Sequence, residues 1–190
     1  IYRCVKFLED PENFSSAQGK YISFSYNKNI NLMPIYISNC KMNVNSENSC
    51  ERLVQQFDPY MHQYYSVHRT QNLKDAFDLI SHTNFRELYN LVELTTAMIA
   101  AINGKHKILS LFYCAREIVF QSGGSLSENV LTISTSKKYI SQYYNFINAI
   151  TQYLYKQSGL EFTTAEECVL KSMATYLNFV REKHQNKSFL

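Results

Sequence analysis

One apolar run constrains the fold of this chain more than any other feature of the sequence. From Ile108 to Phe120, isoleucine, leucine, phenylalanine, alanine and valine fall on nearly every side of a helix. A helix that is apolar all round lies in the middle of a core, with other helices on both sides. The run therefore predicts a buried helix over 106–121, ended by Gly123 and Gly124.

The segment between residue 48 and this run predicts further helices. Asn48 or Ser49 suits the N-cap position of a short helix that contains Leu53. A longer helix with apolar residues at helical spacing begins near 73 or near 84. Asn103 and the glycine after it end that helix.

After the central run, the sequence predicts one short β-like segment and two more helices. The β-like segment is Val130-Leu131-Thr132-Ile133. One helix starts from Ser136, and the last opens with two overlapping capping boxes over 163–167. Packed around a buried middle helix, these elements predict an all-α fold: a three-layer helical sandwich with a small β-turn.

The first 48 residues differ from the rest in their sequence pattern. Short β-like runs at 20–26 and 34–38 are separated and followed by polar, asparagine-rich stretches. We therefore expect residues 1–48 to be a linker or loosely attached arm, and residues 49–190 to form the helical domain.

Length and charge exclude several classes of function. The chain has 190 residues and a net charge of +3, with its basic residues scattered. Because no basic stripe tracks a phosphate backbone, we do not expect this segment to bind nucleic acid by itself. No apolar run reaches the length of about 18 residues that a membrane helix needs, so we expect no membrane span.

Patterns typical of metal sites and catalysis are weak. The five cysteines show no C-x-x-C spacing, and the five histidines include no i, i+4 pair. Cys168 follows two glutamates, whose negative charge raises the pKa of a thiol and makes it less reactive. The sequence therefore predicts no metal, no cofactor and no enzymatic activity.

Four segments match a known family in their order and spacing. They are Leu91–Leu94, the central run Ile108–Val119, Glu128–Ile133 and Leu160–Val169. Together they resemble the third helix, the buried middle segment, the β-turn and the eighth-helix entry of nuclear receptor ligand-binding domains. Among these receptors, the chain is most similar to the retinoid-related orphan receptor branch.

The resemblance implies a pocket for a lipophilic ligand such as a sterol or a fatty acid. Such pockets are mostly apolar, with one or two polar anchors. The alternative is that the same apolar side chains simply fill the core. The positions similar to pocket-lining residues are Ile80, Leu88, Leu91, Val119, Leu131, Ile133 and Phe146.

The resemblance also implies a structural salt bridge between Glu117 and Arg181. Glu117 stands on the otherwise apolar central run, and a buried carboxylate without a partner is costly. In the family, its partner is an arginine just after the eighth helix, where Arg181 stands. The alternative is that Glu117 reaches the surface, or pairs with Arg116 or a lysine.

Some features depart from the family. The two lysines that hold a coactivator peptide fall on Thr96 and Phe112, and the family's dimerisation and activation helices are not recognisable. The resemblance implies a regulatory domain of a transcription factor in the nucleus, which binds a lipophilic ligand, a coregulator protein or a receptor dimer partner. DNA would be bound only by a separate zinc-containing domain of a parent protein. The alternative function is a helical protein–protein interaction module without a ligand.

Overall fold

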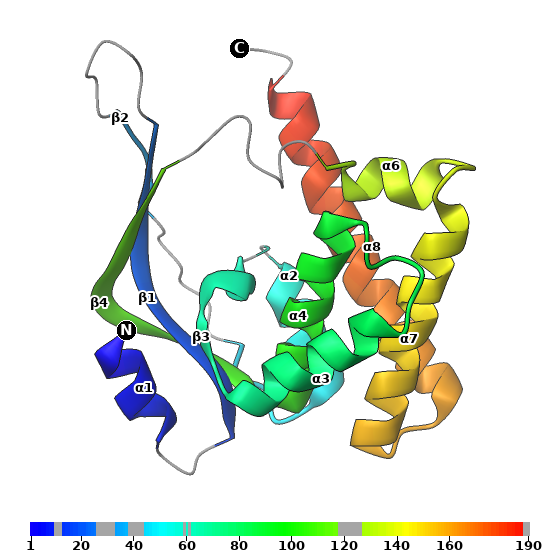
Figure 1. Cartoon of the computed structure of the whole chain (residues 1–190), viewed down its shortest axis with the longest axis horizontal. Helices are drawn as coiled ribbons and strands as arrows, with labels where there is room; N and C mark the ends of the chain where they lie inside the picture. The colour runs from blue at the N-terminus through cyan, green and yellow to red at the C-terminus, as the bar shows by residue number, and fades with distance from the viewer. Residues whose placement is uncertain are drawn as a thin grey trace.

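The computed structural model describes residues 1–9, 13–25, 33–37, 44–58, 60, 62–117 and 127–187. The fold is mixed α/β, so the predicted all-α sandwich is wrong. Figure 1 shows a sheet on one side of the molecule and a group of helices on the other. The strands are β1 (Phe14–Ser25), β2 (Met33–Ile37), β3 (Val67–His68) and β4 (Lys105–Glu117). The helices are α1 (Tyr2–Leu8), α2 (Ser49–Phe57), the 3-10 helix η1 (Gln63–Tyr65), α3 (Thr70–Ser81), α4 (Tyr89–Asn103), α6 (Val130–Thr135), α7 (Ile140–Ser158) and α8 (Phe162–Lys187).

As far as Glu117, the run predicted to be the buried central helix forms strand β4 instead, and its predicted end at Gly123 and Gly124 lies outside the described residues. Strand β4 pairs in parallel with β1, from Phe14 opposite Lys105 to Phe24 opposite Glu117. A continuous apolar run fits a buried strand as well as a buried helix, and its periodicity does not separate the two. The isoleucine, phenylalanine and tyrosine content of this run favours a strand, where such side chains pack well on a pleated surface.

Strand β1 is the centre of the sheet. β4 pairs with one of its edges, while β2 and β3 pair antiparallel with different parts of the other edge. The ladder between β1 and β4 is irregular on both sides of Lys20, where β4 carries extra residues. At Gly19, a Cβ atom would stand 2.7 Å from the carbonyl oxygen and Cδ1 of Leu111, so a side chain has no room there.

The first 48 residues contain both β1 and α1, although this stretch was predicted to be an arm. Cys4 and Leu8 of α1 are buried against Ala17 of β1 in a small core of their own. Leu109 and Tyr113 of β4 pack against the same small core. Where the structure describes it, the amino-terminal segment is thus integrated into the sheet.

The main core lies among the helices, and α4 is its buried helix. Leu91, Leu94 and every residue from Thr95 to Ile102 on α4 are buried. Gly104 is the C-cap of α4, as predicted for the end of the long helix, but the helix begins at Tyr89 and α3 is a separate element. The helix that is buried on most sides is therefore α4, which directly precedes the run that was predicted to form it.

The predicted β-turn at Val130–Ile133 is also wrong, because these residues begin helix α6. The Asn129 side chain accepts a hydrogen bond from the backbone N–H of Thr132 at 2.8 Å and caps this helix. Val130 and Ile133 stand three residues apart and are both buried, so the helical spacing places them on the core side. The local cap and the core contact together outweigh the β propensity of the run.

Candidate functional site

Most of the described residues predicted to line a ligand pocket lie in or beside the main core. Ile80, Leu91, Ile133 and Phe146 are buried there, and Leu88 packs against them. Leu131, on α6, is half-buried. Val119 lies outside the described residues. The fold thus packs most of these side chains against one another. The ring of Phe146 contacts the ring of Phe85 edge to face, with 5.5 Å between the ring centroids.

The predicted ion pair between Glu117 and Arg181 does not form. Glu117 ends strand β4 and Arg181 lies on α8, both are exposed, and no ion pair joins these two described side chains. The expectation assumed that Glu117 stands on a buried helix. At an exposed strand end, the carboxylate is hydrated and needs no partner.

A buried arginine that was not among the predicted site residues ties α2 to the end of α4. Arg52 is only 8% exposed, and all its donor nitrogens bind backbone carbonyls. Nε donates to Ala101 at 2.7 Å and Nη2 to Ile102 at 2.6 Å, at the carboxyl end of α4. Nη1 donates to the carbonyls of Ser46 and Glu47 at 3.0 and 2.8 Å. A cation at a helix carboxyl terminus also interacts favourably with the helix dipole.

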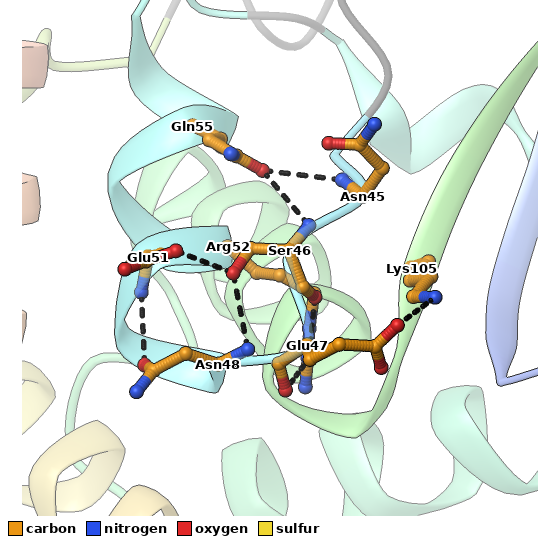
Figure 2. Close-up of polar contacts among 8 residues, drawn as sticks. All are labelled: Asn45, Ser46, Glu47, Asn48, Glu51, Arg52, Gln55 and Lys105. Carbon is orange, nitrogen blue, oxygen red and sulfur yellow. Dashed lines mark hydrogen bonds and ion pairs between the residues drawn. The ribbon is translucent and has the colours of Figure 1, made fainter.

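Polar residues around Arg52 fix the chain that leads into α2. Of the two residues predicted for the N-cap, Asn48 and Ser49, it is Asn48 that caps α2: its side chain accepts from the backbone N–H groups of Cys50 and Glu51 at 2.8 and 3.2 Å. Lys105 binds Glu47 beside this turn, and its hydrogen bond and charge lower the pKa of the Glu47 carboxyl. Figure 2 shows these side chains converging on the 45–48 segment.

The surface next to Arg52 is hollowed, with a volume of about 310 Å³. Glu47, Ser49, Gln157 and Ser158 are among its lining residues, so the hollow is polar. The guanidinium group donates to backbone carbonyls on every nitrogen, which leaves it poorly placed to receive an anion. Its role is structural: it joins two helices and the incoming loop.

A second polar cluster is buried where β1, β3, β4 and η1 meet. Ser16 Oγ lies 2.9 Å from Nδ1 of His106, and Nε2 of Gln63 donates to Ser16 Oγ at 3.0 Å. Nε2 of His68 lies 2.9 Å from the backbone oxygen of Gln63. Among the described residues, Nε2 of His106, Nδ1 of His68, Oε1 of Gln63 and Nε2 of Gln18 have no hydrogen-bond partner.

Burial dominates the electrostatics of this cluster. It lowers the pKa of His106 to about 3, helped by the nearby charge of His68, and it also lowers the pKa of His68. A serine beside a histidine resembles the nucleophile–base contact of hydrolases. Here both Ser16 and His106 are fully buried, so no substrate reaches them in this conformation. The cluster members are far apart in sequence, and only the fold reveals it.

The third feature is an exposed apolar area on the sheet. Phe112 on β4 is 64% exposed. It borders a hollow of about 260 Å³ whose other lining residues are Lys20, Tyr21 and Ile22 of β1 with Ser110 and Leu111 of β4. Nearby, the guanidinium of Arg116 stands 3.8 Å from the centre of the Tyr65 ring, a cation–π contact that fixes this end of β4.

Potential metal ligands, cysteines and long helices are three further features of the described residues. In the ranges given above, no group of three or more histidine, cysteine or acidic side chains is placed to hold a metal ion. The four described cysteines are free thiols, and burial raises the pKa of Cys168, as does a hydrogen bond with Cys50. Within the same residues, no helix is both long and apolar enough to cross a membrane.

No family model, no curated protein and no solved structure matches this chain. Its function is therefore inferred from the geometry of its own residues.

Proposed function

We propose that this chain is a protein-interaction module that accepts an extended segment along the outer edge of β4. The observation that carries this proposal is the position of Phe112, a large and mostly exposed apolar side chain on the last strand of the sheet. In the part of the chain that the structure describes, no strand pairs with that edge from Leu109 to Glu117. Among the described residues, an isolated bridge on that edge joins Val44 to His106, nearer the start of β4.

Such an edge recognises a partner by adding a strand. The exposed N–H and C=O groups bind the backbone of an extended peptide, and side-chain hollows select alternate residues. The hollow beside Phe112 is lined largely by apolar and aromatic groups. It therefore suits one apolar side chain of the added strand.

A lipid-binding receptor domain has less support than an interaction module. As far as Glu117, the segment that resembles the buried middle helix of receptors is a strand, and five of the positions similar to pocket residues pack in or beside the core. The positions of the two coactivator-binding lysines of receptors also give no support to a receptor domain. Thr96 is buried on α4, and Phe112 is exposed on the sheet.

The proposal is tested by selecting binders from a library of random twelve-residue peptides displayed on phage. We expect the recovered peptides to bind the wild-type chain and to lose at least about tenfold in affinity for Phe112→Lys. Phe77→Lys is the matched control, because Phe77 is also exposed but lies on α3. Peptides that bind both variants equally would contradict a site on β4.

A further inference from the structure

We infer that Cys50 and Cys168 form a redox-sensitive pair that closes to an intramolecular disulfide and joins α2 to α8. The inference goes beyond the proposed function and does not rest on it. Its basis is the position of the two thiols, which come from helices that are far apart in the sequence and pack against each other in the fold.

Both cysteines lie on the core side of their helices. On α2, Cys50 stands three positions before Leu53 and seven before Phe57, so the three side chains share one face. Leu53 and Phe57 are fully buried, and Cys50 packs, partly exposed, against the same core. On α8, Cys168 is only 8% exposed and belongs to that core. Both thiols thus contribute to one packed layer.

A second contact between the same two helices supports the meeting of the thiols. At the other end of α2, the centroid of the Phe57 ring lies 5.3 Å from that of Tyr176 on α8. Cys50 precedes Phe57 by seven residues and Cys168 precedes Tyr176 by eight, which are nearly equal distances along two helices. Helices that run side by side in this register bring Cys50 to Cys168, and a hydrogen bond joins the two thiols.

The two thiols differ in exposure, which gives them different roles. Cys50 is partly exposed in the first turn of α2, so an external reagent reaches it first. Burial raises the pKa of Cys168, and the hydrogen bond and charge of Cys50 raise it further. A mixed disulfide at Cys50 removes these last two causes, while the charge of Lys171 continues to lower the pKa of Cys168. Modification of Cys50 therefore prepares Cys168 to attack it.

The oxidant is a low-molecular-weight disulfide such as oxidised glutathione. Cys50 loses its proton and its sulfur attacks one sulfur of the oxidant, which gives a mixed disulfide and releases one glutathione that takes up the proton. Cys168 then loses its proton and attacks Sγ of Cys50, so the protein disulfide forms and the second glutathione leaves as a thiol. The two protein thiols lose two electrons in total, and the oxidant gains them.

The place of Cys50 near a helix end allows the bond to close. A disulfide brings its sulfurs closer than a hydrogen bond does, so a side chain or a helix end must shift. The ends of helices open more easily than their interiors. The bond closes a loop of more than a hundred residues, and cross-links across long loops restrict the unfolded chain most. The oxidised chain is therefore expected to unfold at a higher urea concentration than the reduced chain.

Peptide mapping without reductant tests the inference. The reduced chain is incubated with oxidised glutathione, free thiols are blocked with N-ethylmaleimide, and trypsin then releases Cys50 on peptide 42–52 and Cys168 on peptide 157–171. We expect the link between these peptides to form at least about tenfold faster in the folded chain than in the chain unfolded in urea. A thiol reductant should break the link and restore the original urea midpoint.

Two serine variants separate the roles of the thiols. In Cys168→Ser, a mixed disulfide with glutathione is expected to accumulate on Cys50. In Cys50→Ser, glutathione should react with Cys168 at least about tenfold more slowly than with Cys50 in the other variant, because Cys168 is buried. Cys114→Ser is the matched control, because Cys114 is also partly exposed but lies on β4. Circular dichroism checks that each variant is folded.

A folded wild type that forms no link between Cys50 and Cys168, or forms it no faster than the unfolded chain, would overturn the inference. So would a link that is mainly between other cysteines. The wild type alone decides these outcomes, even if a variant fails to fold. Equal reaction of Cys168 in Cys50→Ser and of Cys50 in Cys168→Ser would overturn the order of the two steps.

Discussion

Acid destabilisation through His106 is the sharpest consequence of the buried polar cluster. Burial holds the pKa of His106 at about 3, whereas an unfolded histidine titrates near 6.5. The unfolded state therefore binds more protons between these values. Stability contributed by neutral His106 is fully present above pH 6.5 and is lost as the pH falls toward 3. Between pH 7 and pH 5, the two values give a loss of about 2 kcal/mol in the free energy of unfolding.

Urea unfolding, followed by circular dichroism at pH 7, 6 and 5, measures this loss. In His106→Asn, the short amide stands near the position of Nδ1 and keeps an acceptor for Ser16 without a titratable group. The variant is expected to be less stable at pH 7 by about 1–3 kcal/mol, because a buried side chain becomes smaller. It should also lose most of the pH dependence between 7 and 5.

Two further comparisons isolate the effect. His82→Asn is the control, because it replaces an exposed histidine outside this cluster. His68, whose pKa is also lowered by burial, adds a smaller loss of the same sign in both variants. The loss of unfolding free energy between pH 7 and pH 5 is compared in the wild type and in His106→Asn. If the two losses differ by less than about 0.5 kcal/mol, His106 is not buried as the fold requires.

Three substitutions test the packing of the fold. Arg52→Met leaves the terminal carbonyls of α4 without their donors and should lower the free energy of unfolding by about 3 kcal/mol in urea titrations. A change below about 1 kcal/mol would refute the structural role of Arg52. Gly19→Ala places a Cβ against Leu111 and should cost about 1–3 kcal/mol in the same assay, whereas a neutral result would mean that β4 does not approach β1 there. Asn129→Ala removes the cap of α6 and should lower stability by about 1 kcal/mol, while Asn129→Asp, which keeps an acceptor, should not.

Local signals in the sequence predicted two helix ends correctly. Asn48 caps α2, and Gly104 ends α4. Each of these depends on a side chain or a backbone conformation within a few residues of the helix terminus. Such local signals do not depend on how the rest of the chain folds.

The sheet was not predictable by the same reasoning. Whether Ile108–Glu117 is a helix or a strand depends on β1, which lies almost ninety residues earlier and pairs with it in parallel. The β-like run at 20–26 overlaps β1, but it lies in a polar, irregular-looking segment, and nothing local indicated that it pairs with the later run. The Ser16–His106 contact depends on the same long-range pairing, and the hydrogen bonds of Arg52 join it to carbonyls 49 and 50 residues further along the chain, so sequence reasoning missed both.

Backbone assignment of the labelled chain by NMR tests the central claim most directly, namely that residues 105–117 are a strand paired with β1. The account predicts extended-type carbon chemical shifts from Lys105 to Glu117. It also predicts inter-strand contacts between protons of Ser16 and His106 and between Tyr21 and Cys114. Helical shifts across this run, with contacts four residues apart, would contradict the sheet, the β4 edge and the interaction proposed for it.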